Sequence, residues 1–105
     1  MPTGMKQYES SLNSKVVKYL NSLPNSHCYK RHAGPFRKGR ADVAGTIQGM
    51  SIELEGKIGD NTPTPLQREW LSDAGKAGAV TGVFYSLADV KRILKENGIK
   101  GIEEN

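Results

Sequence analysis

Apolar and polar positions along the chain follow patterns that predict helices and strands in a definite order. From Gln7 to Leu23, apolar residues recur every three or four positions, which predicts an amphipathic helix that Pro24–Asn25 ends. Residues 26–33 (SHCYKRHA) predict a short strand. The glycines and prolines of residues 34–39 predict a flexible basic loop after it.

The next part of the chain predicts a β-hairpin. Small or apolar residues alternate with other residues from Ala41 to Ile47 and again from Ile52 to Ile58. Gln48–Gly49 between the two segments is typical of a two-residue turn. With that turn, Gly45 faces Ile52, and one face of the hairpin is apolar throughout.

The remaining residues predict two helices with a strand between them. Thr62 is a candidate N-cap, with Pro63 in the first turn of a helix that continues to about Lys76. Residues 78–85 (GAVTGVFY) predict a buried strand, and Ser86 predicts the N-cap of a last helix that ends near residues 97–98. The predicted order is helix, strand, strand, strand, helix, strand, helix. This order indicates an α/β fold, with a mixed central sheet flanked by helices.

Two acidic residues and a lysine meet on the other face of the predicted hairpin. In the same register, Asp42 lies opposite Glu55, and directly opposed side chains have Cβ atoms about 5 Å apart. Lys57 lies two residues further along and therefore projects from the same face as Glu55. Two neighbouring carboxylates destabilise a sheet unless a positive charge lies between them.

A divalent cation would account for this patch. Mg²⁺ prefers oxygen ligands and is held by one or two carboxylates together with water and substrate phosphate. Asp42 and Glu55 supply carboxylates, and the carbonyl of Gly56 lies between them and Lys57. Such a cation activates a bound water and stabilises charge on a phosphoryl oxygen, while the lysine orients or deprotonates that water or steadies the phosphate. The alternative is a solvated strand face with a weak surface ion pair.

Positive charge is concentrated in the first part of the chain. The net charge is +4, and residues 1–41 carry +7 while residues 42–105 carry −3. A field of this kind attracts polyanions such as nucleic acid, although a solvated basic face without a partner gives the same pattern. The candidate phosphate contacts are Lys15, Lys18, Lys30, Arg31, Arg37, Lys38 and Arg40.

Length and composition limit the class of protein. The 105 residues suffice for a single domain spanning 1–105, and no apolar run approaches the ~18 residues of a membrane span. The single cysteine, Cys28, cannot form an internal disulfide, and with His27 and His32 it makes only a weak zinc pattern. We therefore expect Cys28 to be a small buried apolar residue, and we expect a cytoplasmic protein.

Four sequence motifs occur in a definite order along the chain. They are GRADVAG (39–45), EGK (55–57), TPLQ with WL (64–71), and AGA leading into SLADV (77–90). With these motifs in this order and at this spacing, the chain resembles the virus-type replication-repair nuclease (VRR-NUC) domains of the PD-(D/E)XK superfamily, which have the restriction-endonuclease-like fold. The resemblance extends from about Gly39 to Leu94 and, less specifically, back to Glu9.

The resemblance implies a Mg²⁺- or Mn²⁺-dependent endonuclease and assigns roles to individual residues. Asp42 and Glu55 match metal-binding carboxylates, and Lys57 matches the catalytic lysine. Gln67 matches a glutamine that helps shape the active site, and Glu9 matches a first-helix glutamate that contacts metal or its water. Ala41 stands where the family often has proline, which metal binding does not require.

The family also suggests the substrate and the assembly. Stand-alone members resemble Holliday-junction resolvases, so the resemblance implies a homodimer that cuts branched DNA in the cytoplasm of a bacterial or phage-infected cell. The alternative is a non-catalytic or weakly active nucleic-acid-binding module. Gly56 favours that alternative, because glycine replaces a bulkier residue and is typical of a bulge that would shift Glu55 relative to Asp42. A nuclease acting on RNA or on duplex ends is a weaker third interpretation.

Overall fold

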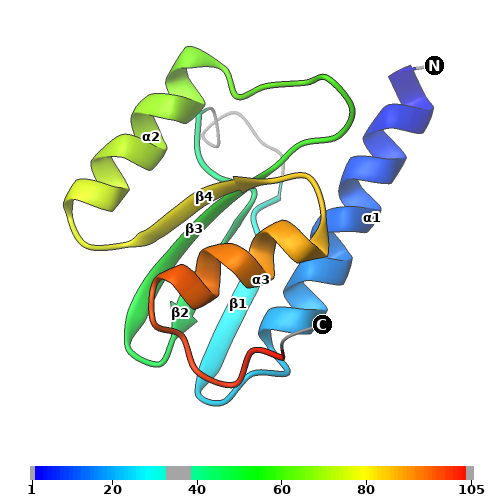
Figure 1. Ribbon diagram of the computed structural model, residues 1–105. Coiled ribbons are helices and arrows are strands. Elements are labelled where there is room, and N and C mark those ends of the chain that lie inside the picture. Colours follow the sequence, from blue (N-terminus) through cyan, green and yellow to red (C-terminus); the bar gives the residue numbers. More distant parts are fainter. Residues whose placement is uncertain (1, 33–38, 104–105) are drawn as a thin grey trace.

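Residues 2–32 and 39–103 are described by the computed structural model, with side chains from residue 8 onward. They form a small α/β domain with three helices and a four-stranded mixed sheet (Figure 1). The strand order is β1-β2-β3-β4, in which β2 is antiparallel to β1 and β3, and β4 is parallel to β3. The elements are α1 (Pro2–Leu20), β1 (Ser26–Lys30), β2 (Val43–Ile47), β3 (Met50–Gly56), α2 (Pro65–Lys76), β4 (Val80–Phe84) and α3 (Leu87–Glu96).

The hairpin of β2 and β3 has the predicted register. Ile47 pairs with Met50 and Gly45 pairs with Ile52. Gln48 and Gly49 form the turn with φ of 52° and 84°, and two positive φ values suit a turn whose twist matches that of the strands. The prediction of a two-residue turn is therefore confirmed, and with it the pairing that places Asp42 beside the end of β3.

Helices cover both faces of the sheet. One face carries the apolar core, in which Val16 and Leu20 of α1 and Val90 and Leu94 of α3 are fully buried. On β4, the neighbouring residues Thr81 and Gly82 lie against α2 and α3 respectively. Since successive strand residues point to opposite faces, α2 covers the face opposite α1 and α3. Figure 1 shows α3 and α1 in front of the sheet.

Two predicted helix boundaries are wrong. The first helix ends at Leu20 rather than Leu23. The second begins at Pro65, and its N-cap is Thr64 rather than Thr62. Thr64 Oγ1 accepts a hydrogen bond from the Gln67 N–H at 3.2 Å, and Gln67 Oε1 accepts one from the Thr64 N–H at 2.9 Å. This capping box satisfies two N–H groups at the helix end, which Thr62 is too far away to do.

Other boundaries move by a few residues. The first strand ends at Lys30, before residues 31–33 of the predicted segment. The predicted strand 78–85 is shortened to Val80–Phe84, while Ser86 is confirmed as an N-cap and Asn97 as the end of the last helix. Most of the predicted basic loop, residues 33–38, lies outside the described residues. No helix in the described part of the chain combines the length and the apolar character needed to cross a membrane.

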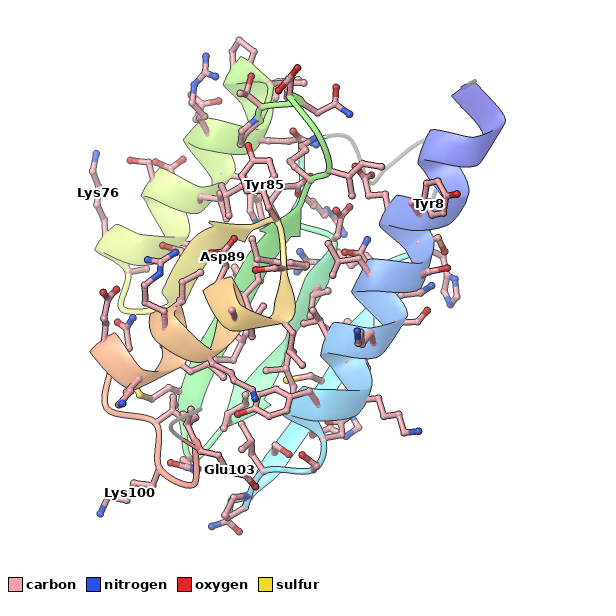
Figure 2. All side chains as sticks on the ribbon, turned by 45° about the vertical axis from the view of Figure 1, so that its right-hand side comes forward. Tyr8, Lys76, Tyr85, Asp89, Lys100 and Glu103 are labelled. Atoms are coloured by element: carbon pink, nitrogen blue, oxygen red, sulfur yellow. The ribbon has the colours of Figure 1, made fainter. Side chains whose placement is uncertain are left out.

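Tyr8 and Trp70 lie at apolar positions of their helices, where core packing is expected, but both are partly exposed. Tyr8, which belongs to the apolar stripe of the first helix, is 71% exposed (Figure 2). Helix α2 has no buried residue, because it covers only β3 and β4 on a face that carries polar side chains. Trp70 is therefore half-buried rather than part of the core. Cys28 is buried as predicted, and burial raises the pKa of its thiol to about 11.

Candidate active site

Asp42 and Glu55 lie together at one end of the β2–β3 hairpin. Asp42 directly precedes β2, and Glu55 is the penultimate residue of β3. Both are buried, with exposures of 6% and 1%. The Gly56 N–H donates a hydrogen bond to Asp42 Oδ2 at 3.1 Å, and Lys57 Nζ lies 3.5 Å from Glu55 Oε2. The structure thus brings together the two carboxylates and the lysine, as the hairpin register predicts.

The surroundings of Glu55 disfavour its charged form. Burial, and then the negative charge of Asp42, raise the pKa of Glu55 to about 7, against the opposing effect of Lys57. Glu55 Oε1 is buried and has no hydrogen-bond partner among the described residues. One lysine therefore does not offset the burial of the two carboxylates, and either a proton on Glu55 or a cation would relieve the remaining charge.

The donor set fits a hard divalent cation. The two buried carboxylates, of which Glu55 has one oxygen without a partner, match the preference of Mg²⁺ and Mn²⁺ for oxygen ligands. In the described ranges, no group of three or more His, Cys, Asp or Glu side chains is placed to hold a metal. Asp42 and Glu55 would therefore hold the ion with a main-chain carbonyl such as that of Gly56, and water or phosphate oxygens would complete the shell.

Gly56 has a packing explanation. A Cβ at this position would overlap Asn13 Oδ1 of α1 and lie 2.8 Å from Phe84 Cζ of β4. The pairing of β3 with β4 continues regularly to Gly56 and Phe84. The expectation of a bulge at Gly56 is therefore wrong, because the glycine makes room for side chains from α1 and β4 while the strand stays regular.

The other two predicted site residues lie on helices, Gln67 on α2 and Glu9 on α1. The described hydrogen bonds of the Gln67 side chain and N–H lie within the cap of α2. Glu9 is half-buried on α1, one turn before Asn13, whose side chain reaches Gly56. Because residues four apart lie on one side of a helix, Glu9 shares the helix face that approaches this end of the sheet. Its role toward a metal stays a prediction.

The candidate phosphate contacts differ in their surroundings. Lys15, Lys18 and Arg40 are exposed. Lys30 Nζ donates hydrogen bonds to the hydroxyls of Ser10 and Ser14 at 3.3 and 2.9 Å. Arg31 is half-buried and bound to other protein groups. Arg37 and Lys38 lie outside the described residues.

Sequence reasoning missed a polar cluster next to Asp42, formed by Arg31, Glu53 and Trp70. Arg31 Nη1 and Nη2 donate to the two Glu53 carboxylate oxygens at 2.7 and 2.9 Å. Trp70 Nε1 also donates to Glu53 Oε1 at 2.7 Å. The sequence indicates only that Glu53 shares a strand face with Glu55, and it does not identify Arg31 after β1 and Trp70 on α2 as the partners of Glu53.

Comparisons with known proteins give no match: no family model, no curated protein and no solved structure is similar to the chain at the level that we required.

The carboxylate pair gives a specific dependence of stability on pH. Without divalent cations, folded Glu55 keeps its proton to about pH 7, whereas an unfolded chain releases it near pH 4.5. The contribution of Glu55 is therefore fully present below pH 4.5 and is lost as the pH rises to about 7. This loss in the free energy of unfolding is at most about 3 kcal/mol.

Urea unfolding in EDTA at several pH values measures this effect. The difference between wild type and Glu55→Gln isolates Glu55 from the other titrating groups. We expect wild type to lose stability relative to the variant between pH 4.5 and 7, and we expect Mg²⁺ to reduce the loss. Parallel curves for the two proteins would contradict the assignment.

Proposed function

We propose that this chain is a Mg²⁺- or Mn²⁺-dependent endonuclease that hydrolyses phosphodiester bonds in DNA. The observation that carries the proposal is the buried Asp42–Glu55 pair with Lys57 beside it, at one end of the sheet. Glu55 is a buried carboxylate with a raised pKa and an unpartnered oxygen, which is costly for stability, and functional sites are where such costs are common.

The fold supports a relation to the PD-(D/E)XK nucleases and their VRR-NUC branch. The element order and the mixed sheet agree with what the sequence resemblance implies. Two of the four motifs also lie side by side, since the Glu55–Gly56 part of EGK ends β3 and GRADVAG leads into β2, which pairs with β3. The packing around Gly56 removes the reason to interpret the glycine as a sign of a decayed site.

In the proposed reaction, a water attacks phosphorus and releases a proton to the solvent, while the bond from phosphorus to the leaving oxygen breaks and that oxygen takes up a proton from solvent water. A bound divalent cation would lower the pKa of that water and stabilise charge on the phosphoryl oxygens. Asp42 and Glu55 are the residues that would hold the ion. Lys57 orients the water or steadies the phosphate from its position 3.5 Å from Glu55 Oε2. Its side chain is only 13% exposed, so Lys57 has little freedom to leave the site.

The proposed substrate is branched DNA, cut by a homodimer. A single active site cuts one strand, whereas resolution of a four-way junction requires two symmetric cuts, which a two-fold dimer supplies. Exposed Lys15, Lys18 and Arg40 provide contacts to phosphates, which give affinity without reading the base sequence.

Cleavage of labelled DNA tests the proposal. A four-way junction, a linear duplex and a single strand are incubated with the protein in Mg²⁺, Mn²⁺ or EDTA, next to Glu96→Gln as a control that removes an exposed carboxylate on α3. We expect paired nicks near the branch point, in the presence of metal only, with wild type and the control alike. Binding without cleavage in either metal would instead indicate a nucleic-acid-binding module.

A further inference from the structure

The cluster of Arg31, Glu53 and Trp70 joins three elements next to the candidate active site. Arg31 follows β1, Glu53 lies on β3 two residues before Glu55, and Trp70 lies on α2. The Arg31 and Glu53 side chains are only 16% and 12% exposed. The guanidinium group also lies over the Trp70 ring, with Cζ 5.4 Å from its centroid. A bidentate pair of this kind has one preferred geometry, which makes the cluster rigid.

This cluster holds the main chain at Asp42. The Arg31 N–H donates to the Asp42 carbonyl oxygen at 2.8 Å, and Arg31 Nη1 donates to the Ala41 carbonyl oxygen at 3.0 Å. Two consecutive carbonyl groups are thus bound by one residue, whose guanidinium group is fixed in turn by Glu53. The side chain of Asp42 is held separately, because its carboxylate accepts a hydrogen bond from the Gly56 N–H.

We propose that Arg31, Glu53 and Trp70 are positioning residues, which fix the main chain at Asp42 so that its carboxylate stays on the Gly56 N–H beside Glu55. That this positioning affects the rate of DNA cleavage rests on the proposed function. Carboxylates that hold a cation must keep their separation, and a displacement of about 1 Å is enough to lower a reaction rate strongly.

The proposal separates two arginines that the sequence places in one group. Arg31 acts inside the protein, with its guanidinium group bound by Glu53 and by the Ala41 carbonyl. Arg40 is exposed, and its guanidinium carbon lies 5.8 Å from the centroid of the same Trp70 ring. Trp70 therefore lies beside both, and of these two arginines Arg40 is the one exposed to DNA phosphates.

Hydrogen exchange of the Gly56 amide tests the positioning role without metal or DNA. Exchange is measured by NMR on the full chain in EDTA for wild type, Glu53→Gln and Trp70→Phe. Arg92→Gln, which removes ion pairs on α3, is the matched control. We expect Gly56 to exchange at least about tenfold faster in Glu53→Gln, with little change at Ile52 in the middle of the same strand. We expect Arg92→Gln to leave both amides unchanged.

Two results would overturn the proposal. An unchanged Gly56 amide would mean that the cluster does not hold Asp42 in place. Equal acceleration at Gly56 and Ile52 would mean that the cluster only stabilises the fold. Trp70→Phe removes a single hydrogen bond to Glu53, so it supplies the same measurement if Glu53→Gln does not fold.

Cleavage kinetics then separate positioning from DNA binding. We expect Glu53→Gln to lower kcat about tenfold or more with KM nearly unchanged. A raised KM with unchanged kcat would mean that the cluster contributes to DNA binding and does not position Asp42 for catalysis. If wild type itself does not cut DNA, the proposed function fails, while the exchange of Gly56 still decides whether the cluster positions Asp42.

Discussion

Replacing Glu55 by glutamine is expected to lower DNA cleavage by roughly a thousandfold while the protein stays folded. Glutamine has nearly the same volume, so the buried position, which is 1% exposed, keeps its packing. The variant loses one of the two charges that would hold the cation. Without metal, it also avoids the cost of burying a charge and the repulsion from Asp42, which together raise the pKa of Glu55. We therefore expect the variant to unfold at a higher temperature than wild type in EDTA at pH 8.

Three measurements check this expectation. Cleavage rates in Mg²⁺ are compared for wild type, Glu55→Gln and the control Glu96→Gln. Calorimetric titration with Mn²⁺ shows whether the variant has lost the ion, and thermal unfolding in EDTA shows whether its fold is intact. A folded Glu55→Gln protein that cuts DNA at the wild-type rate would remove Glu55 from the mechanism. Binding of DNA should be kept or strengthened, because a negative charge near the phosphate path has gone.

The second large effect is expected from Gly56→Ala. The added methyl group would overlap Asn13 Oδ1 and lie 2.8 Å from Phe84 Cζ, so the side chains of α1 and β4 must move. Insertion of one carbon into a packed interior typically lowers the free energy of unfolding by roughly 1–3 kcal/mol. Because two contacts are close here, we expect a loss of about 3 kcal/mol. Because the same strand carries Glu55, we also expect cleavage to fall in the portion of the protein that remains folded.

Urea unfolding measures the effect, with Gly75→Ala on exposed α2 as the control. There the nearest atom, Thr81 Oγ1, lies 3.3 Å from the added Cβ, and alanine favours the helix, so we expect little change or a small gain in stability. Asn13→Ala combined with Gly56→Ala should recover part of the loss, since one of the two contacts is then relieved. A stable Gly56→Ala protein would mean that α1 does not pack against this strand as described.

The hairpin and its acidic pair were predictable because they depend on local information. Alternation with a period of two and a two-residue turn determine the register, and the register places Asp42 beside Glu55. The start of α2 was harder, because Thr62–Pro63 and Thr64–Pro65 are equally good candidates by residue type. Only the spacing of Thr64 to Gln67 distinguishes the two, since it allows the reciprocal hydrogen bonds of the cap.

The surroundings of the site were not predictable in this way. Gly56 is explained by Asn13 on a distant part of the chain. The amphipathic pattern of α2 suggests that Trp70 is a core residue, yet the helix packs on a face where Glu53 and Arg31 are its partners. The alternating pattern gives the face of a strand residue and does not say which helix covers that face. Contacts of this kind depend on the packing of whole elements.

The turn at Gln48 has a practical consequence for experiments on this protein. The Gln48 side chain donates hydrogen bonds to the carbonyl oxygens of Pro24 and Lys100, and its Oε1 accepts one from the Lys100 N–H. Lys100 is thereby fastened at the end of the hairpin remote from Asp42, roughly 20 Å away along the strand. Figure 2 shows the Lys100 side chain extending outward there. A fluorescent dye or a surface anchor attached at this lysine would leave the carboxylate end of the sheet open to large ligands.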